Sequence, residues 1–97
     1  MDERGRVVHC RRQAFEVYIG RPSEFGNPYR MVLDGNRETV IKLFELYALG
    51  RMESDSPWRE KVKALYGKTL GCYCAPKPCH GDVLLRLAAN LKSESGE

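Results

Sequence analysis

The sequence predicts an α/β fold: a small mixed sheet covered by about three helices in a single compact domain. Its 97 residues, of which 42% are hydrophobic, suffice for one modest core. Two short runs near the N-terminus are rich in β-branched and aromatic residues, whereas apolar residues recur at helical spacing farther along. A third strand-like run follows two helical segments, which indicates a crossover to a strand parallel to an earlier one.

The first two strands are expected at residues 6–11 and 15–20, and the short gap between them favours a hairpin. Residues 21–30 follow and contain Gly26-Asn27-Pro28, which is typical of a loop. The domain is expected to span residues 1–97, with its core at about 6–92 and a polar tail at 93–97.

The first helix is expected from Arg37 to Leu49, with Asn36 as N-cap and Gly50 as C-cap. Its apolar stripe consists of Val40, Leu43, Phe44 and Tyr47. A second helix opens at Ser56-Pro57, because proline is favoured in the first turn, and runs to about Tyr66 before Gly67. Trp58 is expected in the core.

The third strand is expected at residues 68–74, followed by a turn and a last helix that begins near Cys79 and His80. The apolar positions of this helix are Val83, Leu84, Leu87, Ala88 and Leu91. Both the loop after residue 20 and the turn after Cys74 leave the carboxyl ends of strands. Ligands bind at such ends in open α/β sheets, so we expect both loops to border one pocket.

The cysteine-rich turn admits three interpretations. Cys72, Cys74, Cys79 and His80 form a ligand set typical of zinc, and His9 or Cys10 could replace one of them. Zinc is therefore the cofactor that the sequence suggests.

The second interpretation is catalytic. Cys79 lies at a helix N-terminus, which lowers the pKa of a thiol, and His80 is placed to activate it. The third interpretation is structural: Cys72 and Cys74 are small buried side chains, and His80 and Asp82 cap the last helix.

The loop before the first helix is a candidate anion site. Arg21 and Arg30 offer forked donors for phosphate, Gly26 permits a close backbone approach, and Asn27 suits a base or ribose. Asp82 completes the candidate ligand-binding set. The structural alternative is a turn in which Asn27 caps the local backbone.

Charge and composition restrict the partners. The net charge is +3 with a pI near 8.7, which suits a small phosphate-bearing molecule as well as nucleic acid. Six arginines crowd the N-terminal third, and at this net charge a solvated surface is favoured over nucleic-acid contact. No apolar run reaches the ~18 residues of a membrane span, so no membrane partner is expected. The N-terminus has no apolar signal core, which indicates a cytoplasmic protein with reduced thiols and leaves Cys72 and Cys74 without a disulfide.

Residues 18–29, with Gly-Asn-Pro, and residues 70–84, with Cys-His-Gly-Asp, resemble a family of small bacterial and phage proteins catalogued as domain of unknown function 4326. The resemblance extends from about Val7 to Asn90. It implies one α/β domain with a site at these two loops, and it names no chemistry.

Together these observations favour a protein that binds a nucleotide-like or phosphate-bearing ligand between the two loops and acts on nucleotides or nucleic acid. Cys79 and His80 would react, while Arg21 and Asn27 position the ligand. The alternatives are a zinc-stabilised module that binds nucleic acid or protein without catalysis, and a nucleotide sensor or sponge. Whether the chain is an enzyme, and its oligomeric state, stay open at this point.

Overall fold

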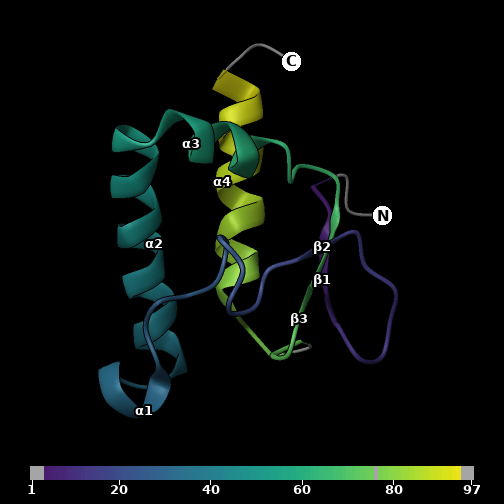
Figure 1. Cartoon of the computed structure of the whole chain (residues 1–97), viewed down its shortest axis with the longest axis vertical. Coiled ribbons are helices and arrows are strands. Elements are labelled where there is room, and N and C mark those ends of the chain that lie inside the picture. Colours follow the sequence, from purple (N-terminus) through teal and green to yellow (C-terminus); the bar gives the residue numbers. More distant parts are fainter. Residues whose placement is uncertain (1–3, 76, 95–97) are drawn as a thin grey trace.

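The computed structural model describes residues 4–75 and 77–94. Three strands form one sheet: β1 (Arg6–His9), β2 (Val17–Tyr18) and β3 (Thr69–Cys72). Three longer helices accompany it, α2 (Arg37–Ser54), α3 (Ser56–Lys63) and α4 (His80–Glu94), with a single-turn helix α1 (Met31–Asp34) before them. All of the labelled helices lie to one side of the sheet (Figure 1). The expected α/β class is confirmed.

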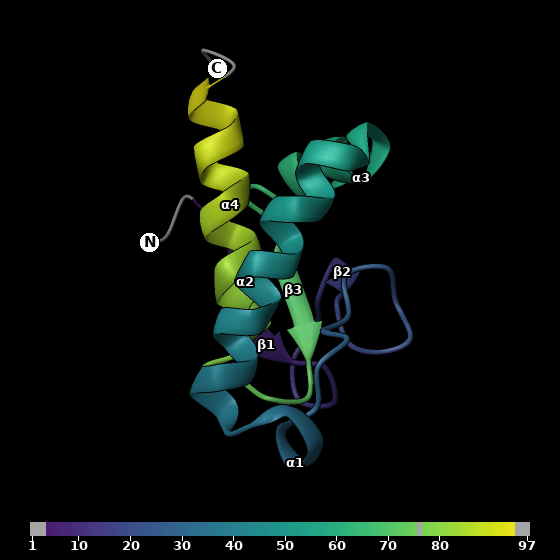
Figure 2. The same ribbon diagram turned by 90° about the vertical axis from the view of Figure 1, so that its left-hand side faces the viewer.

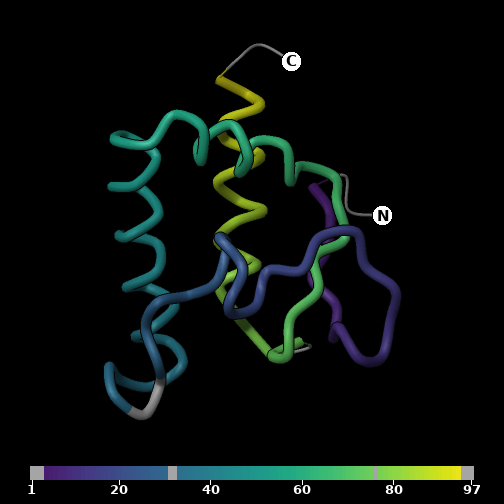
Figure 3. Tube along the Cα trace, in the orientation of Figure 1, coloured from purple at the N-terminus to yellow at the C-terminus, as the bar shows by residue number. Residues whose placement is uncertain are grey.

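The sheet is parallel throughout, with the order β1-β3-β2, so the expected hairpin and mixed sheet are wrong in detail. β3 lies between the two N-terminal strands and pairs Leu70 with Val7 on one side and with Val17 on the other. Its side chains are the most buried of the three strands, which suits a central strand flanked on both edges. The N-terminal strands are also shorter than expected, and residues 10–16 carry the chain past β3 (Figure 3).

The helix starts follow the sequence signals, but some ends do not. The side chain of Asn36 accepts a hydrogen bond from the backbone of Thr39 and caps α2, as expected. Asp55 ends α2 and, by accepting from the backbone of Trp58, begins α3. α3 stops at Lys63 rather than Tyr66, and the chain reverses at Gly67, whose φ is 79°.

α2 runs past Gly50, which is therefore not its C-cap. The residues after Gly50 make tertiary contacts that stabilise a longer helix. The Arg51 guanidinium lies 4.6 Å from the ring centroid of Trp58, and its Nη1 donates to the Tyr47 hydroxyl at 2.8 Å. Met52 packs against the core. These contacts outweigh the cost of a mid-helix glycine, roughly 1 kcal/mol.

The core lies between the sheet and the helices (Figure 2). Its largest fully buried side chains are Trp58, Phe44, Ile19, Leu70, Leu84, Val62 and Cys72. The expected apolar face of α4 is buried over its whole length, and α4 extends to Glu94, so Ser93 and Glu94 of the expected tail are helical. The rest of that tail, residues 95–97, lies outside the described residues.

α4 approaches the sheet closely at Gly81. A Cβ atom at this position would lie 2.7 Å from Cδ1 of Ile19 and 2.8 Å from Cγ2 of Val7. The glycine therefore sets the distance between the first turn of α4 and the strands. Within residues 4–75 and 77–94, no helix combines the length and apolarity needed to cross a membrane.

Candidate functional site

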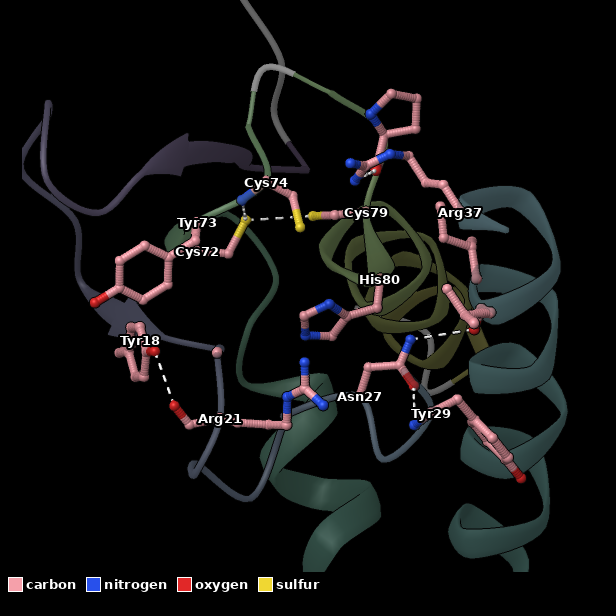
Figure 4. Close-up of a pocket in the computed structure, with 14 residues that line it drawn as sticks. Tyr18, Arg21, Asn27, Tyr29, Arg37, Cys72, Tyr73, Cys74, Cys79 and His80 are labelled. Carbon is pink, nitrogen blue, oxygen red and sulfur yellow. Dashed lines mark hydrogen bonds between the residues drawn. The ribbon is translucent and has the colours of Figure 1, made fainter. Parts of the chain in front are cut away.

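A pocket of about 230 Å³ opens beyond the carboxyl ends of β2 and β3. Figure 4 shows the side chains that line it, which come from both expected loops and from the start of α2. They are Tyr18, Gly20, Arg21, Asn27, Tyr29, Arg37, Val40, Ile41, Cys72, Tyr73, Cys74, Pro78, Cys79 and His80. The structure thus brings the Gly-Asn-Pro loop and the Cys-His turn to one cavity.

The loop of residues 20–30 is held by side chains on α2 and α3. Phe25 is buried in the core, and Nε1 of Trp58 donates to the carbonyl oxygen of Glu24 at 3.0 Å. Asn27 donates through Nδ2 to the carbonyl of Val40 at 3.1 Å and accepts from the backbone of Tyr29 at 2.9 Å. Asn27 therefore joins the loop to α2, so its side chain is largely used within the protein.

Arg21 presents its guanidinium to the pocket, beside the imidazole of His80 (Figure 4). Its side chain crosses Gly26, where a Cβ would lie 3.0 Å from Cγ of Arg21. Gly26 thus makes room for Arg21 rather than for a ligand, and it does not line the pocket. Among the described residues, no carboxylate forms an ion pair with Arg21.

A second guanidinium reaches the pocket from α2. Nη1 of Arg37 donates to the carbonyl oxygen of Pro78 at 3.1 Å, which ties the start of α2 to the Cys-His turn. A backbone carbonyl carries no net charge, so this contact leaves the positive charge of Arg37 uncompensated. The sequence reasoning missed Arg37, because an arginine at a helix start carries no signal of what the helix faces.

The Cys-His-Gly-Asp turn forms a capping box at the start of α4. Sγ of Cys79 accepts from the backbone of Gly81 at 3.3 Å, while Oδ2 of Asp82 accepts from the backbone of Cys79 at 3.2 Å. This reciprocal pair satisfies two backbone donors of the first turn. Asp82 is exposed and does not line the pocket, so its position fits the structural interpretation.

His80 is buried and joins α4 to the end of β2. Its Nε2 lies 2.8 Å from the carbonyl oxygen of Ile19, and because a carbonyl only accepts, Nε2 carries the hydrogen. Burial lowers the pKa of His80, which the backbone hydrogen bonds of Ile19 and Phe25 partly oppose. The imidazole is thus neutral at pH 7, and its catalytic role stays a prediction.

The sulfur atoms of Cys72 and Cys79 lie 3.4 Å apart, and both thiols are free. The hydrogen bond between the two sulfur atoms lowers the pKa of Cys72 to about 6, against the opposing effect of burial. The same hydrogen bond, with burial, raises the pKa of Cys79. In this pair the lowered pKa falls on Cys72 and the raised pKa on Cys79, which reverses the expectation for Cys79.

Aromatic side chains form one wall of the pocket. The rings of Tyr18 and Tyr73 meet edge to face, with centroids 6.3 Å apart (Figure 4). Tyr29 lines the pocket from the loop, and Tyr18 and Tyr73 were not singled out from the sequence as ligand contacts. Their placement at the ends of β2 and β3 is a signal that could have identified them.

Arg30 is exposed and does not line the pocket; its backbone N–H donates to the carboxylate of Asp34 at 2.9 Å. In the described part of the chain, no three or more His, Cys, Asp or Glu side chains gather in a way that would hold a metal ion. Nε2 of His80 is directed to Ile19, so zinc stays a prediction from ligand types alone.

Comparison with known proteins matches residues 4–90 to a family described as "Domain of unknown function (DUF4326)". A curated relative, an uncharacterised 12.4 kDa protein of the nrdA-td intergenic region of Enterobacteria phage T4, is 37% identical over 86 residues. That alignment covers 89% of this chain and 79% of the phage protein. No solved structure matches this chain.

Proposed function

Because this chain belongs to the DUF4326 family, whose description assigns no activity, we propose a function from the pocket itself: it binds a nucleotide-like ligand through its phosphate group. One observation carries the proposal. The pocket lining holds two arginines and no aspartate or glutamate. Two guanidinium groups in one cavity outweigh the single thiolate of Cys72 and attract anions, and guanidinium matches the oxygens of phosphate in geometry.

The aromatic wall supports a ring beside that phosphate. Tyr18, Tyr29 and Tyr73 all line the pocket, and tyrosine rings stack on nucleobases irrespective of sequence. The Cys72–Cys79 pair lies on the other side of His80 from the Arg21 guanidinium in Figure 4. The phosphate is therefore assigned to the side of Arg21, away from the thiolate of Cys72.

The firm attachment of the loop favours binding without rearrangement. Trp58, Asn27 and the buried Phe25 hold residues 24–29 before any ligand arrives. Less ordering is then required on association, so more of the interaction energy is expressed as affinity.

Isothermal titration calorimetry tests the proposal with the nucleoside monophosphate of each base and with the corresponding nucleosides. We expect monophosphates to bind and nucleosides to bind at least about tenfold more weakly, the value of one charge-assisted hydrogen bond. Arg21→Gln should reduce monophosphate affinity by about tenfold or more.

Arg30→Gln is the matched control, since Arg30 lies in the same loop and outside the pocket lining. Its affinity should equal that of the unchanged protein. Binding of no monophosphate, or an equal effect of the two substitutions, would refute the proposal.

A further inference from the structure

The face of the sheet turned away from the helices carries a row of aromatic side chains. Val7 faces α4, because its Cγ atoms lie next to Gly81. Successive residues of a strand face opposite sides of the sheet. Val8, Gly71 and Tyr18 are paired across the three strands one residue further along, so this row faces away from α4. In Figure 1 the helices lie beyond the other face of the sheet, and residues 10–16 loop outward on this side.

Four rings form what we term the aromatic strip: Phe15, Tyr18, Tyr73 and His9. Tyr18 contacts Phe15 on one side and Tyr73 on the other, with centroid separations of 6.3 Å in both cases. His9 continues the row, 5.9 Å from Tyr73 and edge to face with it. Each ring thus contacts the next, and the two middle rings, Tyr18 and Tyr73, also line the pocket.

The strip is built into the sheet and yet exposed. Phe15 covers Gly71, where a Cβ would lie 2.6 Å from Cγ of the ring, so the glycine admits the aromatic side chain. Tyr73 is 54% exposed and Phe15 39% exposed, and both contact Tyr18 between them.

Positive charge surrounds the strip. The Arg11 guanidinium lies 5.5 Å from the ring centroid of Tyr73, and Arg12 lines a shallow hollow with His9. Neither arginine has an ion pair with a carboxylate among the described residues. The nearby Glu16 pairs with Lys68 at 3.9 Å, so it does not offset them.

We propose that the aromatic strip is a stacking platform for a single-stranded polynucleotide, one nucleotide of which enters the pocket. Tyr18 and Tyr73 belong to both the strip and the pocket lining, so the two surfaces are continuous. Exposed rings interleaved with arginines bind unpaired bases and their phosphates without sequence preference. The inference rests on the proposed function and extends its ligand from a mononucleotide to a strand.

Fluorescence anisotropy with labelled oligothymidylate and oligouridylate of about eight nucleotides tests the platform, since this length spans one such surface. We expect an oligonucleotide to bind at least about tenfold more tightly than the monophosphate. Binding of either strand supports the proposal, and the preference between them identifies DNA or RNA as the source.

The double substitution Arg11→Gln/Arg12→Gln should lower oligonucleotide affinity by about tenfold and flatten its dependence on salt, while monophosphate affinity stays unchanged. Tyr73→Ala should lower oligonucleotide affinity by at least about fivefold through lost stacking. Arg59→Gln/Lys61→Gln on α3 removes the same charge elsewhere and should change neither affinity.

Failures of the two proposals are distinguishable. If oligonucleotides bind no more tightly than monophosphates, or the two double substitutions behave alike, the platform is refuted while the pocket proposal stands on the effect of Arg21→Gln. If oligonucleotides bind through the strip and no monophosphate binds, the pocket proposal fails instead. Sedimentation that shows a dimer dispersed by Tyr73→Ala, without oligonucleotide binding, would identify the strip as a contact between copies of the chain and overturn the platform.

Discussion

The contact between Cys72 and Cys79 places the lowered thiol pKa on Cys72, at the end of a strand, rather than on Cys79 at the helix N-terminus. Sequence reasoning placed the acidic thiol at Cys79, because helix N-termini favour negative charge. In the folded chain the Sγ atom of Cys79 lies 3.4 Å from the Sγ atom of Cys72, within hydrogen-bonding distance. Cys72 also accepts from the backbone of Cys74 at 3.4 Å, which adds a donor that the sequence alone does not reveal.

The ultraviolet absorbance of thiolate should report this arrangement. We expect one thiolate to form with a midpoint near pH 6, the pKa of Cys72, in the unchanged protein. Cys72→Ser should remove that transition, and Cys10→Ser, a half-buried control outside the pair, should retain it. A transition that survives Cys72→Ser and disappears in Cys79→Ser would reverse the assignment.

His80 should make the fold sensitive to acid. Because burial lowers its pKa below the ordinary value of 6.5, the unfolded chain binds more protons than the native chain in mild acid. The contribution to stability is therefore full above 6.5 and is lost as the pH falls below that value.

Urea unfolding between about pH 7 and pH 5 measures this effect. We expect the free energy of unfolding to decrease across that range, and the decrease to be smaller in His80→Gln than in the unchanged protein. His9→Gln serves as the control for a histidine outside the core. An unchanged pH dependence in His80→Gln would rule out burial of His80 as its source.

At the scale of elements, two glycines in helices should respond in opposite ways to alanine. Gly81→Ala places a Cβ 2.7 Å from Ile19, so the first turn of α4 must move from the sheet at a cost of about 1–3 kcal/mol. At Gly50 in α2, nothing lies within 4 Å of the added Cβ, and Gly50→Ala should stabilise by about 0.5–1 kcal/mol. Thermal unfolding of both variants measures these changes in stability. Equal changes in the two variants would contradict the close approach at Gly81.

Local signals explain which element boundaries were predictable. The Asn36 cap and the start of α3 at Ser56 depend on neighbours within a few residues, and both were correctly expected. The end of α2 depends on Arg51 meeting Trp58 across the helix pair, which no local pattern contains. β1 and β2 each pair with β3, which comes more than 50 residues later in the chain, so their pairing has no local signal either.

At the scale of the whole molecule, topology located the site better than residue type did. The rule that loops at strand carboxyl ends converge placed the pocket, and Arg21, Asn27, Cys79 and His80 line it as a group. Gly26, Arg30 and Asp82 are close in sequence to lining residues but serve the protein's own geometry. Arg37 could not be chosen beforehand, because its role depends on how α2 faces the cavity.

The position of a bound nucleotide tests most directly whether the pocket between the two loops is a nucleotide site. Titration of the isotope-labelled protein with a nucleoside monophosphate, followed by amide chemical shifts in NMR spectra, maps that position. We expect the largest shifts in residues 18–21, 27–29, 72–74 and 78–80, which hold most of the pocket lining. Shifts confined to α3 and the C-terminal half of α4, or none at all at saturating nucleotide, would contradict a nucleotide site between the two loops.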